Sequence, residues 1–290
     1  MLQAYELESF LDKDDSVNVA YLSIAMRHIG SPHRSSTMME TVGEMPPRTD
    51  ILCSVFLQQL EQRHGASLTF CVLCLLETAR AGLSEAELLA AALLPERSPD
   101  PALPGKLGPC LGTVSREQWC AFLADLQPLL RPVPKSKLPE YTHRWEWQGQ
   151  GSIPLVLADG AIIAASQQRY REHKCFWHRI PASRQANRRL AVFFRSLIAK
   201  GPPDQSTMTE LEFQEASYQY RHAFKDTVHH LIETGEWRVV EIALTDLLYI
   251  RAKSAALSVF HLLQVYFVFD FPTTNFIFTT RVHCRTTPTL

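Results

Sequence analysis

Hydrophobic side chains recur at helical spacing along most of the chain. The clearest stripe has apolar residues three or four positions apart, at Trp119, Phe122, Leu123 and Leu126. Residues 68–76 are almost entirely apolar, which predicts a helix in the centre of a domain. Strand-like segments are confined to residues 129–165. The pattern therefore predicts a mostly α-helical protein.

Polar residues mark where several of these helices should begin. Ser84 with Glu87, and Ser115 with Gln118, have the Ser-x-x-Glu/Gln spacing of a capping box, which satisfies free N–H groups in the first turn of a helix. Before them, a further helix is expected to begin with Asp50 as its N-cap.

Two short strand-like segments follow the first helices. Residues 153–157 and 162–163 flank the turn signal Asp159–Gly160. Three to four helices followed by two short strands is the order of a winged helix. We therefore expect residues 49–200 to form a winged-helix domain with a small β wing. Further helices of this domain are expected at 166–177 and 184–200.

A second domain is predicted after the linker Gly201-Pro202-Pro203. Helices joined by very short turns must pack antiparallel on their neighbours, as at the start of a helical-repeat array of the tetratricopeptide kind. Gly235 stands where the glycine after a helix C-terminus belongs. Residues 201–266 are assigned to this array. Its expected helices cover 207–220, 221–234 and 236–250, and the next begins near Lys253.

The two ends of the chain differ from this body. Residues 1–48 contain one segment with helical spacing, over 17–29. Residues 267–290 have no helical period, and we expect them to form a disordered tail. The apolar run before the tail is interrupted by polar residues such as Asp270, and it falls short of the roughly twenty apolar residues of a membrane span. No membrane span is predicted.

Composition narrows the class of protein. Of the 290 residues, 46% are hydrophobic and 20% are charged, which is typical of a globular chain. The net charge of −1 gives no bulk attraction to nucleic acid or to anionic membranes. Seven cysteines at irregular spacing do not form a disulfide framework, and the N-terminus lacks the basic region of a secretory signal. A cytoplasmic location is expected.

Four segments carry a resemblance to a known family, at residues 18–30, 74–89, 167–172 and 236–253. Together they resemble the region after the nucleotide-binding core in NACHT-type signalling NTPases of the STAND class. That class includes NACHT and WD-repeat scaffolds, the telomerase-associated WD-repeat protein and nephrocystin-3-like tetratricopeptide proteins. The resemblance implies that residues 1–48 close an NTPase core absent from this sequence. It also implies that the winged helix relays the nucleotide state to the repeats, and that relatives oligomerise.

The nucleotide-binding chemistry of that family is missing from this sequence. Its single Gly-Lys pair, Gly105-Lys106, is followed by Leu107 in a Pro/Gly-rich linker and not by Ser or Thr at a strand-to-helix turn. Gln167 occupies a position where the family commonly has a histidine. We predict no cofactor. The alternative is an NTPase fragment that keeps residual nucleotide binding.

Other side chains that could carry chemistry have simpler interpretations. Cys71 and Cys74 have half the spacing of a zinc or redox site, but without a second pair a core position is expected. Glu85 and Glu87 suit the positive end of a helix dipole. Two further groups are not aimed at one ion by helical geometry: His173, Cys175 and His178, and the pair His229–His230. At most one histidine of that pair can face inward, and solvent is the expected environment. No metal site and no catalytic residue is predicted.

One group of residues is a candidate binding surface. The helix over 184–200 contains four arginines and no acid, so these could meet an acidic partner or a phosphate, although a solvated face is the simpler interpretation. The residues are Arg184, Arg188, Arg189 and Arg195.

These observations predict a non-catalytic protein-interaction or regulatory module, a fragment or isoform of a NACHT-type scaffold, with other proteins as its partners. A winged helix also raises nucleic-acid binding as an alternative. The expected reading helix, 116–130, has no basic face, which argues against that alternative. The side chains expected to point outward from it are Arg116, Glu117, Asp125 and Gln127.

Overall fold

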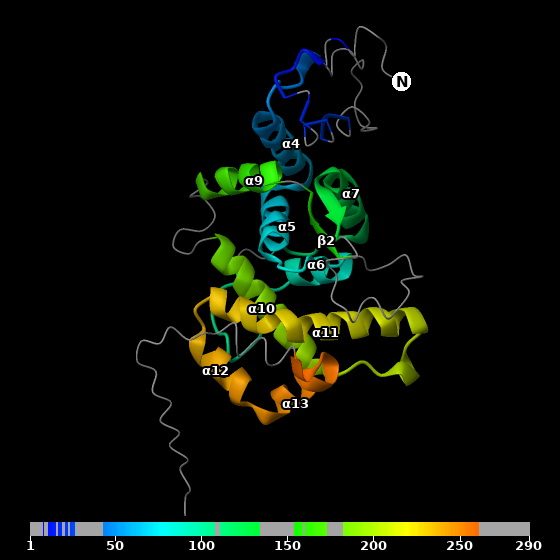
Figure 1. Ribbon diagram of the computed structural model, residues 1–290, viewed down its shortest axis with the longest axis vertical. Coiled ribbons are helices and arrows are strands. Elements are labelled where there is room, and N and C mark those ends of the chain that lie inside the picture. The colour runs from blue at the N-terminus through cyan, green and yellow to red at the C-terminus, as the bar shows by residue number, and fades with distance from the viewer. Residues whose placement is uncertain are drawn as a thin grey trace, which may run out of the picture.

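The protein is mostly helical, with one small antiparallel sheet (Figure 1). The computed structural model describes residues 8, 11–15, 17–18, 21–22, 24–26, 43–107, 111–133, 154–158, 160–172 and 182–260. The predicted mostly α fold class is confirmed. The predicted 267–290 tail, and the cluster His173, Cys175 and His178, lie outside these residues.

The elements follow one another in a simple order. The first half contains α4 (Thr49–His64), α5 (Ala66–Thr78), α6 (Glu85–Ala92), α7 (Arg116–Leu126), the 3₁₀ turn Gln127–Leu129, β1 (Leu130–Pro132), β2 (Leu155–Leu157) and α9 (Gly160–Glu172). The second half contains α10 (Ala182–Lys200), the 3₁₀ turn Gln205–Thr207, α11 (Glu210–Glu233), α12 (Trp237–Thr245) and α13 (Leu247–Ala256).

Helix α5 lies at the centre of the first half, as its apolar sequence predicts. Nine consecutive residues from Leu68 to Leu76 are buried, because α4, α6, α9 and α10 pack around it. Arg169 of α9 pairs with Glu61 of α4 at 2.6 Å, which fixes α9 against the outer side of α4. Both capping boxes are confirmed, and α6 and α7 begin directly after their serines.

The small sheet lies beside α5, with β2 between α5 and α7 in Figure 1. Strands β1 and β2 are antiparallel, with Leu130 opposite Leu157. Leu83, between α5 and α6, forms a bridge to Leu155 on the other edge of β2. Gly82 has φ +77°, and a Cβ atom there would lie 2.8 Å from the carbonyl oxygen of Leu155. Glycine is therefore required where the chain turns into this bridge.

Helix α10 joins the two halves of the molecule (Figure 1). One side of α10 contributes Leu190 and Phe194 to the core around α5. Its other side contributes Ala191 and Val192 to a second core with α11 and α12. The predicted domain boundary near residue 201 thus falls between two helices that pack extensively on each other.

Two features of the second half follow from local sequence. Thr209 caps α11 in a third capping box. After α11, the N–H groups of Gly235 and Glu236 donate to the carbonyl oxygens of Ile232 (2.8 Å) and Leu231 (3.0 Å), and Gly235 has φ +75°. This is a Schellman-type ending, so the predicted role of Gly235 is confirmed.

Several predicted boundaries are wrong. The helices expected at 207–220 and 221–234 are one helix, α11, because no glycine or proline interrupts the sequence there. Conversely, the helix expected over 236–250 ends at Thr245. Asp246 adopts an extended conformation (ψ 111°), and its side chain accepts a hydrogen bond from the N–H of Leu248, so it caps a separate helix, α13.

Two more boundaries differ in the first half. Residues 162–163, expected as a strand, lie in α9, and that helix begins six residues before the predicted start at 166. Asp50 is not the N-cap of α4, because it is already the second helical residue. A distant carboxylate takes that role: Asp15 Oδ2 accepts hydrogen bonds from the N–H (2.7 Å) and the hydroxyl (2.8 Å) of Thr49.

The N-terminal residues that the structure describes pack onto α4. Tyr21, Ile24 and Ala25 are buried with the core around α5. The hydroxyl of Tyr21 donates to the carbonyl oxygen of Pro46 at 2.7 Å. Across the described parts of the chain, no helix has the length and apolar character needed to cross a membrane.

Candidate functional site

A buried cluster of charged side chains lies where α6 meets α11. The capping box of α6 places Glu87 in its first turn, where Oε2 accepts a hydrogen bond from the N–H of Ser84 at 2.8 Å. Its other oxygen, Oε1, lies 2.7 Å from Nδ1 of His222 on α11. Glu87 is therefore more than a charge at a helix N-terminus. Its carboxylate caps the start of α6 and also contacts His222 of α11.

His222 lies between two carboxylates. Its Nε2 atom is 3.2 Å from Oδ2 of Asp226, one turn further along α11. The side chains of Glu87, His222 and Asp226 are each at most 1% exposed. The ring of Phe194 from α10 packs against the imidazole at a centroid distance of 4.9 Å. The cluster is thus buried where α6, α10 and α11 meet.

The surroundings of His222 and Asp226 determine their charge states. Burial alone would lower the pKa of His222, but the charge of Glu87 and hydrogen bonds to Asp226 and Glu87 outweigh burial and raise it to about 10. Burial would raise the pKa of Asp226, but its hydrogen bond with His222 and the nearby cations lower it to about 2. At neutral pH an imidazolium therefore lies beside the Asp226 carboxylate.

His230 continues the same face of α11. Its Nδ1 atom lies 2.7 Å from Oδ1 of Asn187 on α10, an oxygen that can only accept, so Nδ1 carries the proton. Asn187 in turn donates from Nδ2 to the carbonyl oxygen of Ser183 at 2.9 Å. Burial lowers the pKa of His230 to about 3, which keeps this ring neutral at physiological pH.

The arrangement suits a structural ion network better than catalysis. Both nitrogens of His222 are engaged by carboxylates, so neither is left to accept a proton from a nucleophile. All three charged groups are also shielded from solvent. Across the residues that the structure describes, no group of three His, Cys, Asp or Glu side chains is arranged to hold a metal ion.

This cluster was not predicted from the sequence, although a signal was present. His222, Asp226 and His230 follow one another at intervals of four, so they share one face of a helix. The expectation that solvent surrounds His229–His230 is wrong for His230, which is fully buried, whereas His229 is partly exposed. The expectation that at most one of this pair faces inward is confirmed.

The four arginines of the expected basic face each make a contact within the chain. Arg184 Nε donates to the carbonyl oxygen of Thr234 at 2.9 Å. Arg188 pairs with Glu236 at 3.1 Å. Both contacts lead from α10 to the end of α11 and the start of α12. These side chains fasten α10 to the end of α11 and the start of α12, while Arg184 itself remains exposed.

The other two arginines make equally internal contacts. Arg195 Nε lies 2.5 Å from Oδ2 of Asp100 in the loop between α6 and α7. Arg189 is 2% exposed, and it donates to the Sγ atom of Cys71 (3.1 Å) and to the carbonyl oxygen of Leu94 (2.7 Å). The acids and carbonyl groups that satisfy these arginines lie far away in the sequence, so the spacing within α10 did not reveal them.

The core interpretation of the two cysteines in α5 is confirmed. Cys71 and Cys74 are 6% and 7% exposed. Burial raises the pKa of both thiols, most strongly for Cys74, so neither is prepared to act as a thiolate ligand or nucleophile.

The nucleic-acid alternative rested on α7, which the structure also describes. Arg116 and Glu117 are exposed side by side at its start. Asp125, expected to point outward, instead pairs with His64 (2.9 Å) and Arg63 (3.2 Å) of α4. The outer face of α7 therefore carries charges of both signs and no basic stripe.

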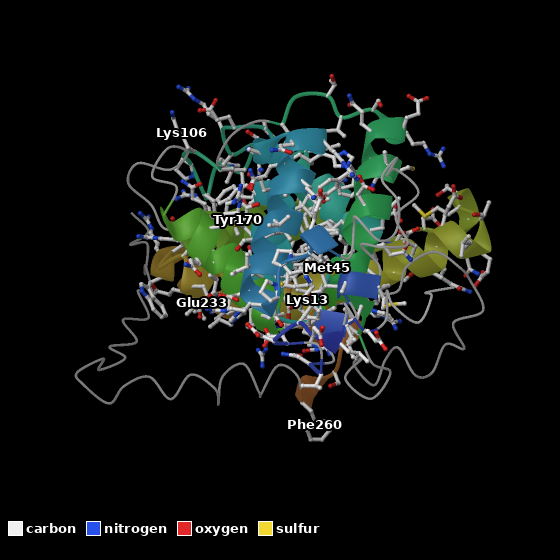
Figure 2. All side chains as sticks on the ribbon, turned by 90° about the horizontal axis from the view of Figure 1, so that it is seen from above. Lys13, Met45, Lys106, Tyr170, Glu233 and Phe260 are labelled. Atoms are coloured by element: carbon white, nitrogen blue, oxygen red, sulfur yellow. The ribbon has the colours of Figure 1, made fainter. Side chains whose placement is uncertain are left out.

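A second candidate site is an exposed apolar set, which we call the α12–α13 surface. Large hydrophobic side chains on α12, α13 and the residues directly after them are between 55% and 78% exposed. They lie at the end of the molecule opposite α4 and the N-terminus (Figure 1), and Phe260 stands clear of the packed helices in Figure 2. The members are Trp237, Ile242, Leu247, Leu248, Val259 and Phe260.

A helix that packs on one side normally has polar residues on its exposed side, so large apolar residues there are unusual. Leu247 and Leu248 occupy the first turn of α13 at 78% and 75% exposure, while Val239 and Val240 of α12 are buried against α11. Scattered exposed apolar residues need no explanation, but their concentration at one end indicates a contact surface.

Comparison with known proteins identifies no relative. No family model, no curated protein and no solved structure matches the chain.

Proposed function

We propose that the chain is a non-catalytic protein-interaction module whose contact site is the α12–α13 surface. The observation that carries this proposal is the exposure of Trp237, Ile242, Leu247 and Leu248 on the last two described helices. The buried charge cluster supports the non-catalytic part of the proposal. Both nitrogens of His222 contact carboxylates, so this histidine is not available as a general base.

The partner that fits this surface is an amphipathic helix or helical hairpin. Helices α11, α12 and α13 each pack against the helix before them, and short turns join α11, α12 and α13. In such a series every helix covers an apolar face of its predecessor, and the last helix leaves its own face open. A further apolar helical face is the element that continues this packing.

We further propose that the first half is a winged-helix domain. Support comes from the order α5, the Leu83 bridge, α6, α7, β1 and β2, in which β2 lies between Leu83 and β1. The winged helix has this succession of a helix, a short strand, two helices and a hairpin. In this assignment the helices after residue 201 begin a repeat array.

The resemblance to the region after the nucleotide core of NACHT-type scaffolds remains part of the proposal. Its support is the same order of elements, with α11 to α13 in the position of the first repeats. In that setting the module relays a conformational state to its partners, and α10 is the connecting element because it packs into both cores.

A crosslinking experiment tests the proposed surface. A photoreactive amino acid at Leu247 should capture a protein in cell extract, and the same group at Leu211, an exposed leucine on α11, is the matched control. The captured protein is then purified, and its affinity is measured for the wild type, the double variant Leu247→Asp/Leu248→Asp and Leu211→Asp.

We expect the double variant to lose at least about tenfold in affinity, because two leucines that the partner would cover are replaced by charges that must be desolvated on binding. Leu211→Asp should bind as the wild type does. Equal affinity of all three proteins, or a crosslink of equal yield at Leu211, contradicts the proposal.

A further inference from the structure

Lys253 is the one lysine in the described part of the chain that is completely buried. It lies on α13 with 0% exposure. Within the described residues its Nζ atom has no hydrogen-bond partner and forms no ion pair. The ammonium lies over the ring of Tyr249 on the same helix, 5.9 Å from its centroid.

The charges that face Lys253 come mainly from α11. The negative charge of Asp226 on that helix stabilises the ammonium of Lys253. The same carboxylate is already hydrogen-bonded to His222 through Oδ2. Asp226 is also close to His230 and Lys225 of α11. On α12 and α13, the charged side chains Arg238, Glu241 and Arg251 are exposed to solvent.

Burial of an ammonium without a partner is costly, and Asp226 offsets only part of that cost. The pKa of Lys253 reflects the balance: burial lowers it to about 8, even though the charge of Asp226 acts in the opposite direction. Docking of α13 therefore destabilises the ammonium relative to the neutral amine, whereas undocked α13 leaves a hydrated ammonium with its ordinary pKa of 10.5.

Few apolar contacts of α13 offset the cost of burying the Lys253 ammonium. Tyr249 packs on Phe224 of α11 at a centroid distance of 5.3 Å and lies against the second core. Leu247 and Leu248, at the start of the same helix, contribute little because they are exposed. Much of the apolar surface of α13 is thus not used to hold it in place.

We propose that α13 is a releasable element, and that Lys253, buried without a partner among the described residues, is the residue that favours its release from α11. Undocking hydrates the ammonium and uncovers the part of the second core next to Tyr249. The helix docks most firmly when the charge of Lys253 is removed. This inference concerns the conformation of the chain and does not depend on the identity of any partner.

Hydrogen exchange of α13 amides, read by mass spectrometry on the full chain, tests the proposal. Lys253→Met keeps the length of the side chain and removes its charge, and Arg251→Met on the exposed side of α13 is the matched control. At pH 7 we expect Lys253→Met to slow exchange of α13 by at least about tenfold. The pKa difference sets an upper limit of about 300-fold. Arg251→Met should exchange at the wild-type rate.

The pH dependence supplies a second measurement. After correction for base-catalysed exchange, wild-type α13 should gain protection between pH 8 and 9, and Lys253→Met should lack this gain. The difference between the two proteins isolates Lys253, because His222 titrates in both. Faster exchange in Lys253→Met shows that the lysine holds α13 in place, and unchanged exchange shows that its charge is immaterial. Either result overturns the proposal.

Discussion

Nδ1 of His222 lies 2.7 Å from Oε1 of Glu87, across 135 residues of sequence. This contact joins the first turn of α6 to the middle of α11, and it is fully buried. Removal of one member of such a pair leaves an uncompensated charge inside the protein, which costs more than the pair itself contributes.

The first prediction concerns Glu87. We expect Glu87→Ala to destabilise the protein by about 3–5 kcal/mol, because it leaves His222 without its closest carboxylate and removes half of the capping box. The matched control is Glu85→Ala, which removes an exposed acid from the same first turn and should have a much smaller effect. Urea unfolding measures both, and similar losses for the two variants would count against the buried pair.

The second prediction concerns alkaline pH. The pKa of His222 is raised from 6.5 to about 10 in the folded protein, so the folded state holds a proton that the unfolded chain releases. The contribution of His222 is complete below pH 6.5 and declines as the pH rises to 10. In urea melts at pH 6 to 10, wild type should therefore lose stability relative to His222→Gln. A constant difference across this range contradicts the assigned imidazolium.

The third prediction concerns acidic pH. Burial lowers the pKa of His230 from 6.5 to about 3, so between these values the unfolded chain takes up a proton and the folded chain does not. Stability should fall as the pH decreases from 6.5 to 3. The variant His230→Asn should show a shallower fall, and His229→Asn, altered at the partly exposed neighbour, should follow the wild type. Urea melts of the three proteins at pH 4, 5 and 6.5 measure this, and an equally steep fall for His230→Asn and wild type contradicts the prediction.

The fourth prediction concerns the apolar face of α7. Trp119 and Phe122 are 2% and 0% exposed, so replacement of either by alanine should cost about 3–5 kcal/mol. Gln118→Ala removes only half of a capping box at an exposed site and should cost about 1 kcal/mol or less. A reversed ranking in urea melts is incompatible with the packing of this helix.

The fifth prediction concerns nucleotides. We expect no ATP hydrolysis and no affinity tighter than millimolar, since triphosphate charge requires a cradle of backbone N–H groups and a lysine. Lys106, in the only Gly-Lys pair of the sequence, pairs with Glu96 at 3.2 Å instead. Micromolar binding in a calorimetric titration of the purified chain would favour the NTPase-fragment alternative.

Local features of the fold could be predicted from the sequence. The capping boxes at Ser84 and Ser115, the glycine at 235 and the buried stripe on α7 depend on residues within one or two turns. Their hydrogen bonds and spacing are encoded locally, so pattern and geometry agree. The central position of α5 also follows from its sequence, because a helix apolar on all sides must be covered on all sides.

Boundaries between adjacent helices were harder to predict. The division of residues 236–253 into α12 and α13 depends on Asp246, whose side chain caps the second helix. An aspartate inside a helical pattern is compatible with either outcome. The packing of Val239 and Val240 against α11, and of Tyr249 against Phe224, decides where the chain turns.

Only the tertiary structure decided which charged residues are buried. Helical spacing by itself leaves open whether Arg184, Arg188, Arg189 and Arg195 meet solvent, a partner or the chain itself. Their acceptors come from the loop after α6, from α5 and from the end of α11, none of them adjacent in sequence. The same holds for Glu87, His222 and Lys253. The sequence by itself determined most helices and their caps. Long-range packing decided which of their polar residues are buried, because burial depends on contacts between elements that are far apart in the sequence.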